Sequence, residues 1–258
     1  MMTQILAILI AAILAFPQEV IKRTALYPAA GGGISLLAQK SVDPGAGSSS
    51  GVIDLGSAIS SGSLIVVGVT AGFNTSAITS VCDSTSSGAC SSSASTYTLG
   101  THNSGCGAGA CTQWAYTCNS AASVRFFTVN YPQSGDNTVS IMAFSHGVTG
   151  SCHDGSNPTA QTSSSSSPAT LTTGTFTTAV ANEVAVGLFA DDNSCATSFV
   201  GSAGTGFTLG TLASACSSML GVPEYQIYTS TQSSVTASIN VGTGSTGHQV
   251  TFTVETFQ

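Results

Sequence analysis

Residues of the kinds that do chemistry are few in this sequence, and most lie in stretches rich in Gly and Ser. Gly47-Ser48-Ser49-Ser50-Gly51 has the letters of a nucleophile elbow, Gly-x-Ser-x-Gly. That motif needs a strand before it and a helix after it, which together expose the serine hydroxyl. The surrounding Gly, Ser and Pro residues predict a linker instead, so we expect no nucleophile here.

Two histidines and one aspartate lie close together around a cysteine. His146, His153 and Asp154 flank Cys152, and imidazole can bind a metal ion or transfer a proton. The neighbouring Gly and Ser residues predict a loop beside a disulfide. We therefore expect neither a metal nor catalysis at these three residues.

Oxygen ligands for calcium occur at the end of one apolar segment. Asp191, Asp192 and Asn193 follow directly after Glu183–Ala190. Calcium binds such side-chain oxygens, but the longer alternating acidic pattern of a calcium loop is missing. We expect a polar loop and keep calcium as the alternative.

Acidic and aromatic side chains offer two further possibilities. Glu183 and Glu224 could form the carboxyl pair of a glycosidase, but nothing in the sequence brings them together, so we expect both to lie on the surface. Four aromatic residues could form a platform for sugars, although aromatics at alternate strand positions equally face a core: Trp114, Tyr116, Tyr225 and Tyr228. We favour the core, and the sequence predicts no enzyme and no cofactor.

Small and hydroxylated residues replace the charges of an ordinary protein. The 258 residues include 42 Ser, 34 Thr and 29 Gly, but only 4 Lys or Arg and 11 Asp or Glu. Charged residues make up 6%, against about 25% in typical proteins. A net charge of −7 excludes nucleic acid as a partner, because binding phosphates requires many cations. The hydrophobic fraction of 42% excludes a disordered chain.

Cysteines and candidate glycosylation sites indicate the compartment in which the protein is located. Eight cysteines in a chain poor in lysine predict disulfides and an oxidising compartment: Cys82, Cys90, Cys106, Cys111, Cys118, Cys152, Cys195 and Cys216. Their spacing lacks the Cys-x-x-Cys pairs of zinc sites. Short loops favour Cys82–Cys90 and Cys106–Cys111, which leaves Cys118–Cys152 and Cys195–Cys216, although other pairings stay open. The sequon at Asn74 and the Ser/Thr tracts are candidates for glycans on an extracellular or cell-surface protein.

The N-terminus carries the most apolar segment. Ile5–Phe16 is uninterrupted by polar residues, and as a helix it would extend about 18 Å, too short for a bilayer core of about 30 Å. Its length suits a signal peptide, but Lys22 and Arg23 follow it instead of preceding it. Residues 1–23 are therefore either a cleaved signal or a retained assembly segment, with no transmembrane span. Residues 24–51 are predicted to be an arm or linker.

The remaining residues, 52–258, have the apolar alternation of β-strands. The clearest segments predict an all-β fold, a single antiparallel β-sandwich of the jelly-roll or immunoglobulin type: Ser63–Ala71, Thr112–Cys118, Val124–Asn130, Asn137–Phe144, Glu183–Ala190 and, with the cleanest alternation, Gln249–Glu255. A loose repeat relates Leu64–Ala71 to Val184–Ala190 and Tyr97–Gly100 to Phe207–Gly210. It is either a coincidence or the trace of two halves of one jelly roll, each supplying one sheet.

Short turn motifs carry a family resemblance. Val81-Cys82-Asp83-Ser84 followed by Thr96-Tyr97-Thr98-Leu99 resembles a class of uncharacterised secreted bacterial β-sandwich proteins, as do Ala181–Val184 and Gly206–Thr208. The chain departs from that class by an insertion between Cys82 and Cys90. The resemblance covers residues 50–258 and implies a jelly-roll-like sandwich without any known activity.

An apolar arm ahead of a Gly-rich linker and a sandwich is similar to the subunits of extracellular filaments that interlock by donated strands. That likeness is architectural, and it leads us to expect a structural protein that forms a pilus-like homopolymer through its N-terminal arm. The residues expected to enter the neighbour are apolar: Ile5, Leu6, Ile8, Leu9, Ile10, Ile13, Leu14, Ile34, Leu36 and Leu37. If the first segment is cleaved, Ile34–Val42 is the reserve donor, with Ile34, Leu36 and Ala38 on one face. The alternative is a secreted carbohydrate-binding or adhesive module.

Overall fold

A computed structural model defines the backbone of most of the chain. The residues it describes are 33–45, 47–71, 78–100, 110–135, 137–145, 151–154, 161–165, 170–191, 201–213, 219–240 and 248–258. The chain divides into two compact units, Met1–Ala30 and Gly31–Gln258, and every described residue belongs to the second unit. The segment Ile5–Phe16 lies outside the described residues. No helix in the part that is described is long and apolar enough to cross a membrane.

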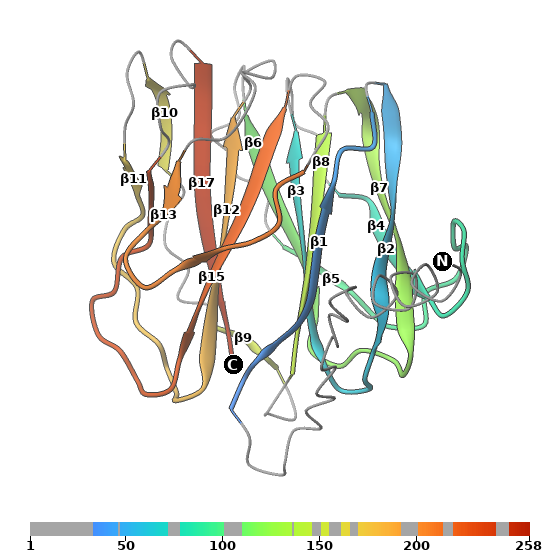
Figure 1. Ribbon diagram of the computed structural model, residues 1–258, viewed down its shortest axis with the longest axis horizontal. Coiled ribbons are helices and arrows are strands. Elements are labelled where there is room, and N and C mark those ends of the chain that lie inside the picture. The colour runs from blue at the N-terminus through green and yellow to red at the C-terminus, as the bar shows by residue number, and fades with distance from the viewer. Residues whose placement is uncertain are drawn as a thin grey trace, which may run out of the picture. The chain divides into compact units, whose positions relative to one another are not determined.

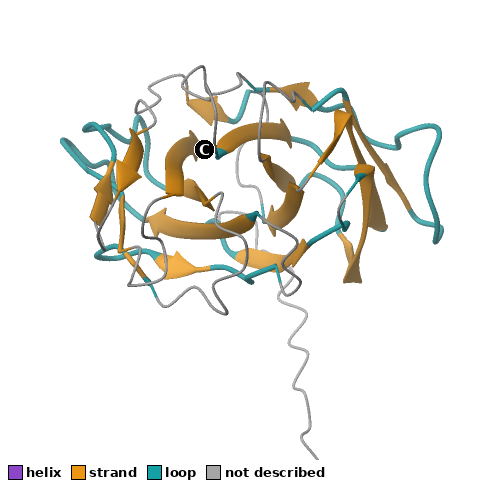
Figure 2. Cartoon of the chain, turned by 90° about the horizontal axis from the view of Figure 1, so that it is seen from above, coloured by secondary structure: helices purple, strands orange, loops and turns teal. Residues whose placement is uncertain are grey.

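The strands among the described residues are antiparallel and form four sheets, which loops join (Figure 2). Sheet A has the order β1 (Leu36–Val42), β8 (Asn137–Phe144), β3 (Leu64–Ala71), β6 (Cys111–Thr117), β5 (Thr98–Leu99). Sheet B has the order β2 (Ser48–Ile59), β7 (Val124–Gly135), β4 (Ser80–Ser84). Sheet C has the order β10 (Gln161–Ser165), β17 (His248–Phe257), β12 (Glu183–Asp191), β15 (Leu220–Tyr228), β14 (Thr208–Leu209), and β9 (His153–Asp154) also pairs with β17. Sheet D has the order β11 (Thr170–Thr172), β16 (Ser238–Asn240), β13 (Ser202–Ala203).

Three apolar cores separate the four sheets. One core lies between sheets B and A and includes Phe127 and Ile141. A second lies between A and C and includes Trp114 and Leu188, and a third lies between C and D and includes Phe252. The sheets therefore stack in the order B, A, C, D, as the ribbon also shows (Figure 1).

This stacking corrects the expected single sandwich. The described residues form two sandwich-like pairs of sheets, A with B and C with D. The strand order of sheet A matches that of sheet C position by position, and the order of sheet B matches that of sheet D. Each half of the chain thus contributes both sheets of one pair, so the repeat is not two halves of one jelly roll.

Register confirms that the repeat in the sequence is a structural one. Thr98 lies opposite Tyr116 in the first half, and Thr208 lies opposite Tyr225 in the second. The following glycines donate equivalent hydrogen bonds: the amide of Gly100 to the Trp114 carbonyl at 2.8 Å, and the amide of Gly210 to the Pro223 carbonyl at 2.7 Å. The similar tetrapeptides at 97–100 and 207–210 therefore have the same role in the two halves.

Burial on both faces explains the most apolar strands. Every residue of β3 and every residue of β12 is buried, because sheets A and C each have a neighbouring sheet on both sides. A strand covered on both faces needs an almost continuous apolar run. In β2 of the outer sheet B, by contrast, Ile53 is buried while Val52 is 49% exposed, the alternation of a half-buried strand.

Small residues and hydroxyls fix how sheets A and C meet. A Cβ on Gly68 would lie 2.8 Å from Leu188 Cδ2, so the leucine fills the space that the glycine leaves. Polar groups cross the same interface: Trp114 Nε1 donates to Thr253 Oγ1 at 3.2 Å, and Thr251 Oγ1 donates to the Ala110 carbonyl at 2.6 Å. The two halves of the chain are thereby joined by shape and by satisfied hydrogen bonds.

Candidate functional site

The first described strand, β1, lies at one edge of sheet A. It pairs antiparallel with β8 from Leu36 opposite Phe144 to Val42 opposite Val139. The reserve donor segment is therefore bound within its own chain, and the folded region begins well before Val52. The expected arm or linker over residues 24–51 includes this strand and the start of β2.

A β-bulge changes the faces of β1 from those expected. Leu36 lies opposite Phe144 and Ala38 lies opposite Ala143, so Leu37 is an extra residue. An extra residue shifts the alternation of the strand by one position. Leu36 accordingly packs on the core between A and C, whereas Leu37 and Ala38 pack on the core between A and B. Leu36 and Ala38 do not share a face.

Hydrogen bonds and partly buried side chains together hold β1 against β8. Ser41 and Ser140 are paired through their hydroxyls at 2.7 Å, and the Ser145 amide donates to the Ser35 carbonyl at 2.8 Å. Most side chains of β1 are only partly buried. The strand is therefore bound laterally along β8, as an added edge strand would be.

A tight turn connects β1 to β2. Gly45 has a φ of 91°, and its amide donates to Asp43 Oδ1 at 2.7 Å. The Ser48 amide donates to the Gly45 carbonyl at 3.2 Å. Ser48–Gly51 then continues as β2, so no helix follows the Gly-x-Ser-x-Gly sequence as a nucleophile elbow requires.

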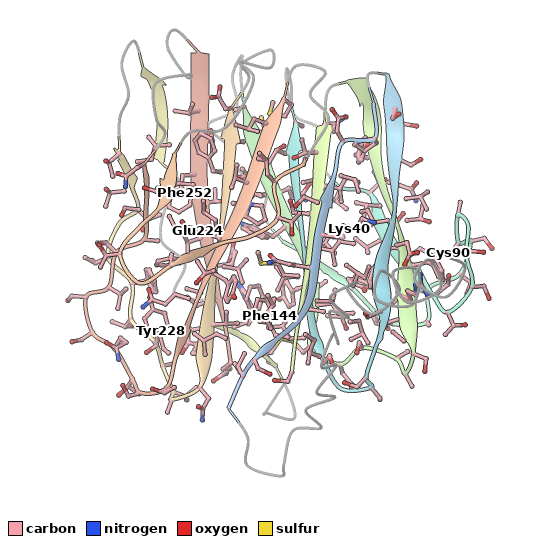
Figure 3. All side chains as sticks on the ribbon, viewed as in Figure 1. Lys40, Cys90, Phe144, Glu224, Tyr228 and Phe252 are labelled. Atoms are coloured by element: carbon pink, nitrogen blue, oxygen red, sulfur yellow. A yellow bond between two sulfur atoms is a disulfide. The ribbon has the colours of Figure 1, made fainter. Side chains whose placement is uncertain are left out.

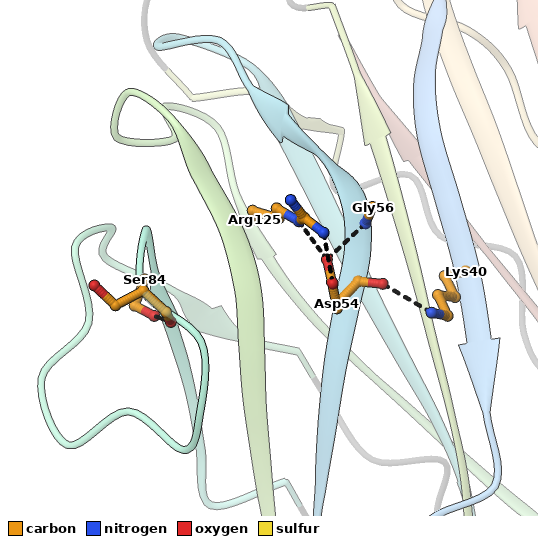
Figure 4. A network of polar contacts seen from close by, with 6 residues as sticks. Lys40, Asp54, Gly56, Ser84 and Arg125 are labelled. Atoms are coloured by element: carbon orange, nitrogen blue, oxygen red, sulfur yellow. Dashed lines mark hydrogen bonds and ion pairs between the residues drawn. The ribbon is translucent and has the colours of Figure 1, made fainter.

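The cations of the described residues gather beside β1 and β2. Arg125 makes two hydrogen bonds to Asp54, at 2.6 and 2.7 Å, and Lys40 Nζ donates to the Asp54 carbonyl at 2.9 Å (Figure 4). The Arg125 guanidinium, together with the Gly56 amide, lowers the pKa of Asp54 to about 2. This exposed network links β1 to the neighbouring sheet B.

The two candidate glycosidase glutamates belong to neighbouring strands of sheet C. Glu224 lies opposite Gly187, four residues along β12 from Glu183. At about 3.3 Å per residue their backbone positions are about 13 Å apart along the strands. Both side chains are fully buried. They are therefore core residues, a correction of the surface position expected for them.

Glu224 is the most unusual ionisable group among the described residues. Its side chain packs over Gly187 and beside Phe252 in the core between sheets C and D (Figure 3). Neither carboxyl oxygen has a hydrogen-bond partner within the described residues. Burial raises its pKa to about 8, and the nearby Gly204 amide, which does not reach hydrogen-bond geometry with either oxygen, offsets this only in part. At neutral pH the group is mostly a neutral acid.

Burial also raises the pKa of Glu183, and a neighbouring carboxyl group adds to the effect. Burial brings this pKa to about 7, and the negative charge and hydrogen bond of Asp154 contribute. His153, the adjacent residue, contacts different partners: its Nε2 lies 2.8 Å from Glu255 Oε2, and its ring stacks on Tyr116 at 5.0 Å. His153 and Asp154 thus contact separate groups, and His146 lies outside the described residues.

The remaining candidate residues divide between the core and parts that are not described. Asp191 is buried at the end of β12, and Asp192 and Asn193 lie outside the described residues, as does Asn74. The aromatic residues belong to the core rather than to an exposed platform, since each packs in an apolar cluster: Trp114, Tyr116, Tyr225 and Tyr228.

Disulfides join both short and long segments. Cys82 is bonded to Cys90, and Cys118 is bonded to Cys152 across 34 residues. Cys111 is also disulfide-bonded, whereas Cys106, Cys195 and Cys216 lie outside the described residues. Disulfides persist in oxidising environments, which indicates an extracellular or periplasmic location.

Asp83 holds together a polar loop. The loop contains the Val81–Ser84 and Thr96–Leu99 motifs, whose role the sequence did not explain. Its carboxylate accepts hydrogen bonds from the Ser95 amide at 2.8 Å, from Ser93 Oγ at 2.8 Å and from the Tyr97 hydroxyl at 3.1 Å. Ser95 Oγ donates to the second oxygen at 2.5 Å. Asp83 is fully buried, so the Asp-Ser turn and the later Thr-Tyr-Thr segment form a single network. The motif therefore builds a rigid loop.

Comparisons with known proteins identify no relative. No family model matches the chain, and neither a curated protein nor a solved structure matches it. The fold class thus stands on the strands and sheets themselves, as an all-β protein with antiparallel sheets packed as sandwiches.

Proposed function

We propose that this chain is a secreted structural subunit that assembles with further copies of itself through its N-terminal region into a filament or surface layer. The observation that supports the proposal is the position of β1. It is an edge strand, it is the first strand described, and it covers the edge of β8, all of whose residues are buried. An edge of this kind accepts a strand from another chain as readily as from its own.

Exchange of β1 between copies would keep its contacts. The strand from a second copy would pair with β8 in the same register, since the two chains are identical. Such swapping is a low-cost route to assembly, because only the connecting turn changes. The connection after Asp43, where Gly45 and Gly47 have positive φ, is the place where the chain would open.

The free energy that holds β1 is modest. Leu36, Leu37 and Val42 are partly buried, and full burial of one such side chain contributes about 1.5–3 kcal/mol. At half burial the three contribute about 2–5 kcal/mol together. That amount holds the strand in place, yet it leaves exchange accessible during folding or assembly.

Other properties of the chain agree with an external assembly. Disulfides, a scarcity of charge and a surface rich in Ser and Thr suit a durable extracellular polymer with acceptor hydroxyls for glycans. Residues 1–23 carry the apolar segment Ile5–Phe16. They are the proposed additional linkage, either removed with secretion or donated to the neighbour.

The test uses two chains that each carry one new cysteine. Ser41 and Ser140 lie directly opposite each other with their hydroxyls 2.7 Å apart, which is within reach of a disulfide. Full-length Ser41→Cys and Ser140→Cys chains are secreted together and oxidised. Exchange of β1 brings the two cysteines together between chains, so a covalent dimer is expected on a non-reducing gel.

Matched controls separate exchange from random oxidation. Each single variant secreted alone should give no specific dimer, and a chain carrying both changes should give ladders if assembly is extended. If the mixed chains stay monomeric while the double variant closes its disulfide within one chain, β1 does not exchange and the proposed mechanism of assembly is wrong.

A further inference from the structure

A polar cavity opens in the first half of the chain, beside the loop that Asp83 organises. Its volume is about 510 Å³, within the range of small-molecule sites. Six of its lining residues carry hydroxyls and one carries an amide: Ser61, Ser95, Thr96, Thr98, Thr117, Ser120 and Asn119. Ala94, Cys118 and Ala121 complete the lining, so no lining side chain carries a charge.

Three of the residues that line this cavity are held in place by bonds to other segments: Ser95, Ser120 and Cys118. Ser95 Oγ donates a hydrogen bond to Asp83, and it accepts one from the Ala121 amide at 2.9 Å. Ser120 Oγ donates to the Ser60 carbonyl at 2.8 Å, and the disulfide to Cys152 holds Cys118. A cavity with a fixed frame does not have to be ordered when a ligand binds, which lowers the cost of binding.

Several polar groups in the cavity remain available to a ligand. The side chains of Ser61, Thr96, Thr98 and Asn119 make no hydrogen bond to another described residue, and all four are exposed. Hydroxyls donate and accept, and the Asn119 amide does both through separate atoms. The site thus presents donors and acceptors together, without a net charge.

The duplicated half shows the same position filled. By register Thr117 corresponds to Gln226, and Thr96 corresponds to Gly206. A Cβ on Gly206 would lie 2.5 Å from Gln226 Nε2, and the Tyr228 hydroxyl donates to Gln226 Oε1 at 2.9 Å. In the second half, large side chains therefore fill the space that corresponds to the cavity. In the first half, small side chains leave that space open.

From this contrast we infer that the first half holds a binding site for a small neutral saccharide. A sugar presents several hydroxyls that both donate and accept, which matches the hydroxyls and amide of the lining. Its C–H groups can contact Ala94 and Ala121. Anionic ligands are disfavoured, because the chain has a net charge of −7 and the described cations are engaged with Asp54. The site is independent of assembly through β1.

The experiment titrates the ¹⁵N-labelled full-length chain with neutral probes by NMR. The probes are the methyl glycosides of glucose, galactose and mannose, and the disaccharides maltose, cellobiose and lactose. At least one should cause saturable shifts of the amide signals of Thr96, Thr98 and Asn119. The disaccharides distinguish a unit within a longer glycan from a single sugar, by whether binding strengthens with the second ring.

Two isosteric variants at equivalent positions provide the control. Thr98→Val removes one hydroxyl from the cavity, and Thr208→Val makes the same change at the matching exposed position of the second half. Thr98→Val should weaken binding about fivefold, the equivalent of one hydrogen bond, and Thr208→Val should leave it unchanged. Absence of shifts with all six probes, or equal affinities for the two variants, would overturn the inference.

Discussion

Replacing Glu224 by glutamine should raise the stability of the protein at neutral pH. The carboxyl group lies in the core between sheets C and D, and its oxygens have no hydrogen-bond partner among the described residues. Burial raises its pKa from the ordinary 4.5 to about 8. A glutamine side chain at this position would be uncharged at every pH, with nearly the shape of the protonated acid.

The size and direction of the effect follow from proton linkage. Because its pKa is raised in the folded state, Glu224 leaves stability intact below about pH 4.5. Stability then falls as the pH rises toward 8, and above pH 8 it falls no further. At 1.36 kcal/mol per pH unit, the loss is about 3 kcal/mol at pH 7 and about 5 kcal/mol above pH 8. These amounts are large beside a total stability of about 5–15 kcal/mol.

Urea unfolding between pH 5 and pH 9 measures this directly. The chain has one tryptophan, Trp114, which is buried between sheets A and C, so its fluorescence reports loss of the core. Glu224→Gln should match the natural chain at pH 5 and exceed it increasingly up to pH 8. A matched variant, Glu183→Gln, should show a difference that stops growing near pH 7, where its pKa lies. Parallel pH profiles for Glu224→Gln and the natural chain would refute the reasoning.

Three further changes have definite expected outcomes. Gly68→Ala places a Cβ 2.8 Å from Leu188 Cδ2 between two packed sheets. It should lower the free energy of unfolding in urea by about 1–3 kcal/mol, and an unchanged urea midpoint would contradict the close packing. Asp83→Asn replaces a carboxylate that accepts four hydrogen bonds and should lower stability by about 1–3 kcal/mol, seen as a lower Tm. Changing both Cys118 and Cys152 to Ser opens a 34-residue loop and should cost about 4 kcal/mol, also measured by Tm; a Tm like that of the natural chain would show that the bond adds little.

The strands were predictable because their signal is local. A segment such as Ser63–Ala71 is apolar throughout, and the segment at Asn137–Phe144 matches the observed β8 at both ends. The short disulfide loop of Cys82 and Cys90 was likewise favoured by spacing. The repeat was visible in the tetrapeptides at 97–100 and 207–210, because the same turn in each half needs similar residues.

The number of stacked sheets was harder to predict from the sequence. In a two-layer sandwich each strand keeps one face toward solvent, so a strand apolar on both faces signals a further sheet. The runs at β3 and β12 carry that signal, and the prediction of a single sandwich overlooks it. The expected faces of β1 are also wrong, because a bulge at Leu37 shifts alternation and leaves no mark in the sequence.

By itself, the sequence determined the all-β class, the paucity of charge, the disulfide chemistry and the outline of the central strands, since composition and alternation act over a few residues. Three features depend on how the chain packs: sheets A and C lie face to face, Glu224 is buried without a hydrogen-bond partner among the described residues, and Asp83 holds a loop beside a polar cavity. The physical reason is that burial and hydrogen bonding at these places depend on residues far apart in the chain. Trp114 and Thr253, 139 residues apart, become neighbours only when the two halves pack together.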